Sequence, residues 1–368
     1  MDNKNTQKAG NNSNQNQFTN CNIVVGTTEE RVRKIIKEEA KNIVASCSFI
    51  AQDMARKRTE IFGEHLLPKL VEEKLLENFK KPEIMIALRE TQKQAMCTDD
   101  EESYELLSKL LSNRIKYSND RLIASSLKNA TEVAIEITDE ALLGLTIFFM
   151  IGRYTLVTGA IDQGLKALND MFGIVDLLNL PNGVGWLEQL DVLKLVRISS
   201  FGILKKILDI YCDALNGYVC VGIKKTSEQY KMAIELLEKS DLSKNNLVTH
   251  ELNEEYVRLP LSNVKSFDGI EIYDTNGNSA SISLEQQYAC EKILELYEKN
   301  DTILNKNKER FAQIWNQFPN LKKVREWWDK IDKSFDVTIV GLVLAYTNIN
   351  NINKSIDLPK MELKDLMK

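Results

Sequence analysis

The sequence has few of the residues that interrupt helices. Its 368 residues include only 16 glycines and 6 prolines, and these two types are the strongest local breakers of regular structure. Apolar residues make up 43% of the chain and charged residues 27%, which is typical of a globular protein. A chain of this length can hold two or three hydrophobic cores. We therefore expect a mainly α-helical protein, built as a multi-helix bundle or array.

Histidine is also scarce, because His65 and His250 are the only two in the chain. They are too far apart in sequence to form a helical zinc pair, and both are expected to be ordinary surface or capping residues. Gly183-Val184-Gly185 is expected to be a turn, since it lacks the third glycine of a phosphate-binding loop. The sequence thus predicts no catalytic residue, no cofactor and no metal site. Aspartate and glutamate are abundant, so a site built on paired carboxylates stays an open alternative.

Long hydrophobic runs are missing as well. The most apolar stretches, 141–151 and 337–346, are shorter than the roughly 20 residues needed to cross a bilayer. The first 22 residues lack the apolar stretch of a signal peptide. The six cysteines form no CxxC pair, and the net charge of -5 gives no support for a nucleic-acid partner. We expect a cytoplasmic protein with reduced thiols and no constitutive membrane insertion.

The first 26 residues form a polar, asparagine-rich segment. Such a composition is typical of a disordered tail, because it cannot bury enough apolar surface to fold alone. A second interpretation is a short strand that stacks on copies of itself in an oligomer, where asparagine ladders are stabilising. Phe18 would lie on one face of this strand, which would continue through Ile23 to Val25.

A long helix is expected next, starting with a capping box of Thr27 and Glu30 and ending near Gly63. Its apolar residues follow a heptad pattern with two kinds of position. Ile36, Ile43 and Ile50 occupy one position, and Ala40, Cys47, Met54 and Ile61 occupy the other. This pattern predicts either a coiled-coil seam between copies or a long helix that packs on its own chain.

Further helices are predicted from the 3.6-residue period and from capping residues. They cover Leu66–Phe79, Pro82–Cys97, Glu102–Tyr117, Arg121–Ile137, Ala141–Val157, Leu187–Leu215 and Thr226–Lys239. Thr98 with Glu101, Asp120, and Thr138 are the expected caps of three of them.

Turn residues become frequent between positions 242 and 283. Ile270, Ile272, Ala280 and Ile282 alternate around Asn276-Gly277, which predicts a small β-hairpin. Ser283 and Gln286 are expected to cap a helix after it. We divide the chain into a polar segment (1–26), a helical body (27–240), a turn-rich region with a hairpin (241–283), a C-terminal helical region (284–350) and a loose tail (351–368).

The C-terminal region contains two features with open alternatives. Ser334–Asn348 is rich in β-branched residues, so both helix and strand are compatible with it. Trp327 and Trp328 are adjacent, and adjacent residues on a helix point about 100° apart. One of the two is therefore expected to be partly exposed as an anchor for a partner, unless both cover the C-terminal core.

Several short stretches carry a resemblance to a known family. They are Lys81–Leu88 with Thr91–Lys93, Leu110–Ile115, Ala130–Ile137, Arg153–Thr155, the polar start 10–26 and Ser334–Asn348. Together they resemble a group of uncharacterised bacterial proteins that carry only locus-style names. The resemblance covers residues 10 to about 350, except around 240–300. It implies a bacterial cytosolic origin and an accessory or mobile-element context, and it supplies no activity and no site residues.

The function that these features favour is a self-associating interaction or scaffold protein. A homo-oligomer is expected, formed through the N-terminal strand and the heptad seam, with a protein partner as a further expectation. The alternative is an effector or enzyme of a bacterial anti-phage defence system. A variant of this alternative is a membrane-active effector that releases Ala141–Val157 or Val337–Tyr346 when triggered.

Overall fold

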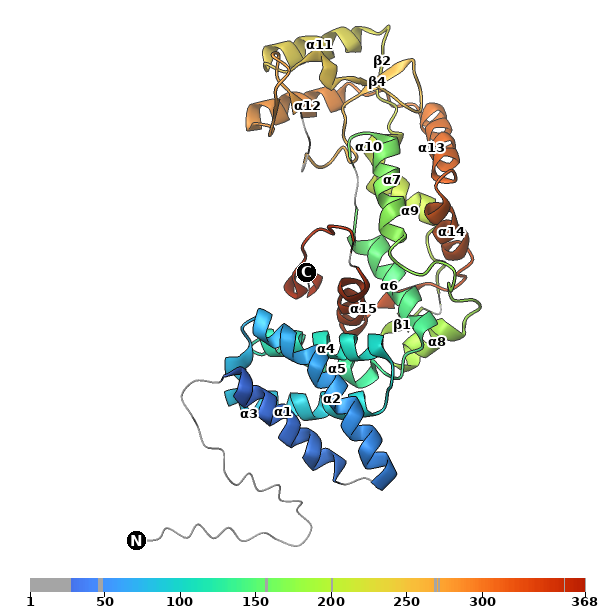
Figure 1. Ribbon diagram of the computed structural model, residues 1–368. Helices are drawn as coiled ribbons and strands as arrows, with labels where there is room; N and C mark the ends of the chain where they lie inside the picture. Colours follow the sequence, from blue (N-terminus) through green and yellow to red (C-terminus); the bar gives the residue numbers. More distant parts are fainter. Residues whose placement is uncertain are drawn as a thin grey trace. The chain divides into compact units, whose positions relative to one another are not determined.

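The computed structural model describes residues 28–45, 49–155, 158–199, 201–267, 270, 272–353 and 355–367. These residues are mainly helical with a few short strands, as predicted (Figure 1). Contacts group the chain into two compact units, Met1–Asp99 and Asp100–Lys368. The predicted segment 1–26 lies outside the described residues, and the predicted boundaries at 240 and 283 stay predictions.

Among the described residues, the elements begin with a run of helices, and short strands occur only from residue 196 onward. The α-helices are α1 (Glu29–Val44), α2 (Phe49–Glu72), α3 (Pro82–Met96), α4 (Glu101–Lys116), α5 (Arg121–Val133), α6 (Asp139–Arg153), α7 (Ile161–Phe172), α8 (Gly185–Val192), α9 (Ile207–Ala214), α10 (Asn216–Val219), α11 (Glu228–Lys239), α12 (Leu284–Glu295), α13 (Asp301–Trp315), α14 (Pro319–Trp328) and α15 (Ile339–Ile352). The 3-10 helices are η1 (Leu76–Lys80), η2 (Lys244–Asn246) and η3 (Leu363–Met367). The strands are β1 (Val196–Ile198), β2 (Ile223–Lys224), β3 (Val248–Thr249), β4 (Tyr256–Arg258), β5 (Ile272–Tyr273), β6 (Ser279–Ala280) and β7 (Phe335–Val337).

The first unit corrects the prediction of a single helix from Thr27 to Gly63. α1 begins after Thr28, whose hydroxyl accepts a hydrogen bond from the Arg31 amide at 3.3 Å, and it ends at Val44. α2 starts at Phe49 and continues to Glu72, so the predicted break and the new helix from Leu66 are wrong too. The sequence between α1 and α2, Ser-Cys-Ser, consists of weak helix formers.

α1, α2 and α3 pack on one another. Gly63 of α2 lies beside Ile36 of α1, because a Cβ atom added to it would make an ordinary contact with Ile36 Cγ2 at 3.4 Å. Gln92 of α3 donates its amide to the Ile36 carbonyl at 3.0 Å, and Arg89 pairs with Glu39 at 2.6 Å. α3 starts with Pro82 at its first turn, which confirms the predicted helix.

The second unit is built around α15, which packs against α4, α5 and α6. The segment from Ser334 forms both a strand and a helix, the two structures that its composition allowed. Its first part is β7, which pairs antiparallel with β1 so that Val337 lies opposite Val196. Thr338 then caps α15. Gly341 allows this close approach, since a Cβ atom there would lie 2.2 Å from the Leu195 carbonyl oxygen.

Three other predictions in this unit were wrong. The helix expected over Leu187–Leu215 ends at Val192, because β1 follows it and pairs with a strand about 140 residues further along the chain. The cap of α4 is Asp100 instead of Thr98; its carboxylate accepts a hydrogen bond from the Ser103 amide at 2.7 Å.

The tail is the third of these corrections. α15 continues to Ile352, and Leu358, Leu363 and Leu366 are buried. The Tyr346 hydroxyl also donates to the Met361 carbonyl at 2.6 Å. The tail was expected to be loose, yet its leucines pack on the chain.

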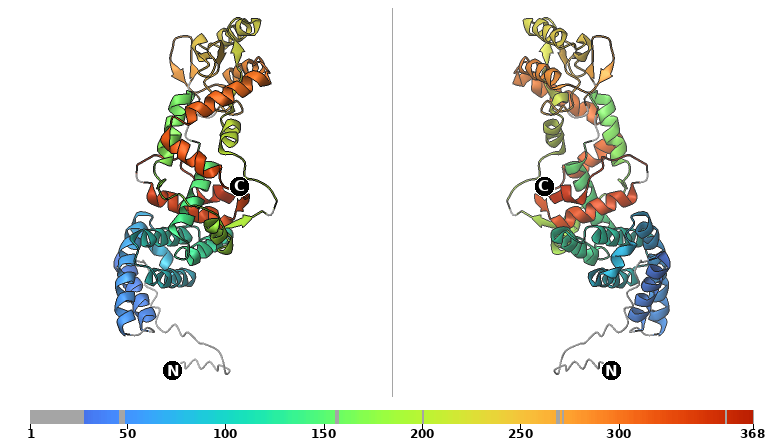
Figure 2. Two further views of the ribbon diagram at one scale, coloured as in Figure 1. Left: turned by 90° about the vertical axis from the view of Figure 1, so that its right-hand side faces the viewer. Right: turned by 90° about the vertical axis from the view of Figure 1, so that its left-hand side faces the viewer.

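The predicted hairpin and its neighbouring capping box are confirmed. β5 pairs with β6, with Ile272 opposite Ala280, and Gly277 takes the positive φ of 82° that the turn requires. Ser283 and Gln286 form the reciprocal capping box of α12. Figures 1 and 2 show α11 and α12 beside β2 and β4, and the antiparallel sheet β2-β4-β3 shares an apolar core with these helices.

A buried arginine links β4 to the start of α7. Arg258 is fully buried, and each of its five N–H groups has an acceptor. Its Nε and one Nη2 hydrogen bind the Glu251 carboxylate at 3.0 and 2.9 Å, and the others bind the carbonyls of Gly159, Leu259 and Leu261. Glu251 in turn accepts the Ile161 amide of α7 at 3.2 Å. This network satisfies a buried charge that would otherwise be costly.

Replacing Arg258 by alanine is expected to destabilise the second unit by about 3 kcal/mol, because removing one partner of a buried pair leaves the other charge and several carbonyls without donors. Arg258→Lys is expected to rescue only part of this loss, since an ammonium has three donors in a different geometry. Thermal unfolding measures the effect. Lys231→Ala is the control, because it breaks an exposed pair with Glu228. Equal melting temperatures for Arg258→Ala and wild type would contradict the account.

Candidate functional site

An exposed apolar stripe runs along α2. Ile50 is 77% exposed, Met54 50% and Ile61 36%. At 100° per residue these three side chains fall within a sector of about 40° of the helix, and Lys57 lies about 20° beyond its edge. The Nζ of Lys57 lies 3.0 Å from the Asp53 carboxylate, which offsets its charge. Phe49, at the start of the helix, is 88% exposed and extends the apolar surface.

The stripe lies on the side of α2 away from its own core. The buried residues of this helix are Ala55, Thr59, Phe62, Leu66, Leu67 and Leu70. Most of them lie more than 100° around the helix from the stripe. α2 therefore has two apolar faces, and the described residues of the chain cover only one of them.

The structure divides the predicted heptad seam between the inside and the outside of the first unit. On α1, Ile36 and Ala40 are buried and Ile43 is half-buried. On α2, Ile50, Met54 and Ile61 face outward. The seam is therefore not one continuous line of side chains, because the helix that would carry it is interrupted. Phe18, Ile23, Val25 and Cys47 lie outside the described residues.

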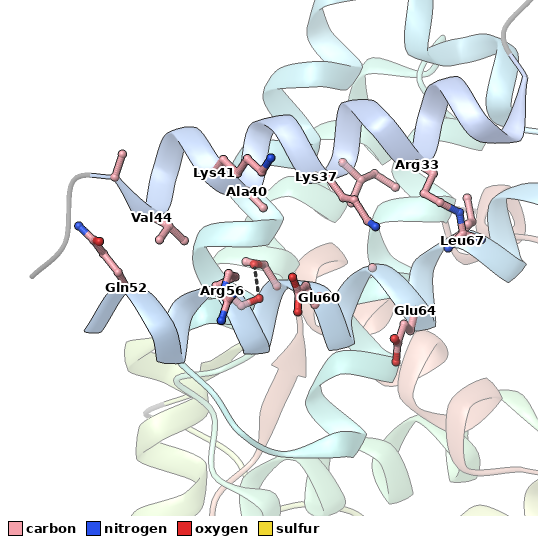
Figure 3. Close-up of a pocket in the computed structure, with 14 residues that line it drawn as sticks. Arg33, Lys37, Ala40, Lys41, Val44, Gln52, Arg56, Glu60, Glu64 and Leu67 are labelled. Atoms are coloured by element: carbon pink, nitrogen blue, oxygen red, sulfur yellow. Dashed lines mark hydrogen bonds between the residues drawn. The ribbon is translucent and has the colours of Figure 1, made fainter. Parts of the chain in front are cut away.

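A groove of about 560 Å³ lies between α1 and α2 (Figure 3). Ile36, Ala40, Val44 and Leu67 provide the apolar part of its lining. It borders the stripe, because α2 contributes one wall of the groove and also carries the stripe. The sequence analysis did not identify this groove, since it depends on how two helices pack.

The two walls of the groove carry opposite charges. Lys37 and Lys41 come from α1 together with Arg33, and Glu60 and Glu64 come from α2 together with Arg56, which is paired with Asp53. Figure 3 shows Lys37 extending from α1 toward α2, where Glu60 lies on the facing wall. In the part of the chain that the structure describes, no ion pair joins these two walls. The one-turn spacing of the lysines was visible in the sequence as a signal of a shared helix face.

Trp327 and Trp328 are both buried, with 7% and 2% exposure. The expectation that one of them is partly exposed is therefore wrong. Trp327 Nε1 donates to the Pro181 carbonyl at 2.9 Å, and Trp328 Nε1 donates to the Lys205 carbonyl at 2.8 Å. Both indoles thus have partners within the second unit, and the geometry favours the alternative that they cover the core.

The cysteines of the second unit are poor nucleophiles. Burial raises the pKa of Cys212 and of Cys290 to about 11, and that of Cys220 to about 12. These thiols stay protonated at neutral pH, and the thiolate is the reactive form. Cys97 is exposed, and its thiol donates to the Lys93 carbonyl at 3.3 Å.

His250 is fully buried, so its predicted place at the surface is wrong. Its Nδ1 accepts the Leu252 amide at 3.1 Å. The ring proton is therefore on Nε2, which donates to the Cys220 carbonyl at 2.7 Å. This arrangement fixes a neutral imidazole inside the core, where both ring nitrogens are engaged by backbone groups.

Four carboxyl groups of the described residues have a pKa below the ordinary value. Asp53, Asp176, Asp213 and Asp274 have shifted pKa values, and all four shift downward, chiefly through hydrogen bonds to the charged form. A general acid needs the opposite shift. Among the described residues, no cluster of three or more potential metal ligands occurs. In the same residues, we find no helix with the length and apolarity needed to cross a membrane.

The buried His250 predicts a pH dependence of stability. Burial lowers its pKa to about 4, so between about pH 6.5 and pH 4 the unfolded chain binds a proton that the folded chain does not. The contribution of the neutral His250 to the free energy of unfolding is therefore fully present above about pH 6.5, and it decreases as the pH falls toward 4. The expected loss from this group between pH 7 and pH 5 is about 2 kcal/mol.

Thermal unfolding of wild type and His250→Asn at pH 7 and at pH 5 measures the contribution of His250 to this loss of stability. The variant is expected to lose less stability than wild type between pH 7 and pH 5. His65→Asn removes the other histidine, which lies in α2, and serves as the control. The same pH slope in wild type and His250→Asn would contradict the assignment.

Comparison with known proteins gives a family and no activity. No curated protein and no solved structure matches the chain. A family model known by a locus-style name, with no assigned activity, matches residues 26–361. This match spans far more than half of the 368 residues, and the protein therefore belongs to this uncharacterised family.

Proposed function

We propose that the protein is a self-associating interaction protein whose copies meet at the first unit. The observation that carries this proposal is the outward apolar stripe of Ile50, Met54 and Ile61 on α2. Single exposed apolar residues are common on protein surfaces, but a row of them at helical spacing is typical of a contact surface.

The energetics of such a contact are favourable. Covering an exposed isoleucine or methionine side chain contributes roughly 1.5–3 kcal/mol when burial is complete. Lys57 does not prevent this, because Asp53 accompanies it and its aliphatic stem can lie along apolar surface. The charged residues that border the stripe, Glu60 and Glu64, then help to select the partner, as the charges beside the seam of a coiled coil do.

Copies of the protein are the simplest partner for this surface. Apolar residues at heptad spacing are the pattern that helices use to pair with one another, and on α2 the residues Ile50, Met54 and Ile61 keep this spacing on the exposed face. A self-associating protein needs no catalytic group, and this agrees with the protonated thiols and the downward-shifted carboxyl groups of the second unit.

Light scattering of the full chain tests the proposal. The wild-type protein is expected to have a mass well above the 42.1 kDa of one chain at micromolar concentration. Ile50→Glu combined with Ile61→Glu is expected to return it to the mass of one chain, because two carboxylates would be placed in the contact.

The control combines Ile86→Glu with Leu122→Glu, which changes two residues of similar exposure outside the stripe. It is expected to keep the wild-type mass, and circular dichroism checks that both variants remain helical. A wild-type mass of one chain at every concentration, or an unchanged mass for the stripe variant, would contradict the proposal.

A further inference from the structure

Resting on the proposed function, we propose that the copies join head to tail. The stripe of α2 in one copy would enter the groove between α1 and α2 of the next copy. The partner of the groove is thus a second copy of this chain. The apolar parts of the two surfaces lie on different faces of α2, with Glu60 and Glu64 between them, so the apolar contacts of one copy can form on both faces at the same time.

The apolar parts of the two surfaces correspond. The stripe presents Ile50, Met54 and Ile61 in a line along the helix. The groove offers apolar lining from Ile36, Ala40 and Val44, and its volume of about 560 Å³ is of the size that holds inserted side chains.

The charges give the contact its direction. Glu60 and Glu64 border the stripe on one side, one helical turn apart. Lys37 and Lys41 form the α1 wall of the groove at the same spacing, and four residues of helix correspond to about 6 Å along the axis. Two pairs between the acidic edge of one copy and the basic wall of the next can therefore form together.

Contacts of the stripe with itself are less favourable. In an antiparallel pair related by a two-fold axis, equal edges meet, so Glu60 and Glu64 of both copies would repel. In a parallel pair, the acidic edge meets the edge that holds Arg58. The Arg58 side chain is only 21% exposed and already binds Asp99 and the Met96 carbonyl. Neither arrangement uses Lys37 and Lys41.

A head-to-tail contact does not close on itself in a dimer. Each copy has one free groove and one free stripe after the first contact, so the chain of copies grows into a ring or an open assembly. The structure therefore assigns to the first unit the ability to build assemblies larger than two copies.

Two variants that each lack one surface test this inference. The stripe variant is Ile50→Glu with Ile61→Glu, and the groove variant is Lys37→Glu with Lys41→Glu. Each alone is expected to be a single chain by light scattering. Mixed in equal amounts they are expected to form a species of twice the mass and no larger, because one intact stripe meets one intact groove.

A charge exchange provides a second arm. Glu60→Lys with Glu64→Lys is expected to pair with the groove variant, since its basic edge meets the new acidic wall. Lys231→Glu with Lys239→Glu, which reverses two exposed lysines of α11, is the control and is expected to keep the wild-type mass. Circular dichroism confirms the fold of every variant.

The outcomes separate this inference from the proposed function. A groove variant that keeps the wild-type mass, while the stripe variant is a single chain, overturns the head-to-tail contact and leaves self-association intact. A mixture that stays at the mass of one chain also overturns it. A wild-type protein that is a single chain at every concentration overturns the proposed function itself.

Discussion

A helix turns once every 3.6 residues, so a long helix with apolar residues on two opposite faces cannot bury both of them against a single neighbouring surface. α2 is the element of this protein where that constraint decides the arrangement. Its buried face, which includes Phe62 and Leu66, packs with α1 and α3. Its other apolar face, with Ile50 and Met54, remains at the surface. The account of self-association follows from this second face.

The groove depends on the same helix. Ile36 of α1 lies at Gly63 of α2, at an ordinary packing distance. The long charged side chains on either side of the contact then form the walls, lysines on α1 and glutamates on α2. A basic wall facing an acidic wall attracts an amphipathic helix with acidic and basic edges, and α2 has an acidic edge of its own. The contact surface and the surface that receives it thus arise from one pair of helices.

Local signals in the sequence were sufficient for much of the fold. Asp120, Thr138 and the Ser283 capping box mark helix starts through hydrogen bonds to residues two or three positions away, and Pro82 marks one because its fixed φ suits the first turn. The hairpin at Gly277 is local for the same reason. The sequence could not show that β1 interrupts a helical pattern, since its partner β7 is about 140 residues distant. For the candidate site, heptad spacing identified Ile50, Met54 and Ile61, but not which side of α2 the core covers. The groove walls required the packing of α1 on α2.

The most direct test of the central claim is whether the outer face of α2 becomes covered when copies meet. Met54 and Met232 are 50% and 51% exposed, and Met232 lies on α11 in the second unit. Peroxide converts exposed methionine to its sulfoxide, so the two rates can be followed together by peptide mass spectrometry at increasing protein concentration. The account predicts that the rate at Met54 falls relative to the rate at Met232 as the protein assembles. A ratio that stays constant while the mass rises would show that the copies meet elsewhere.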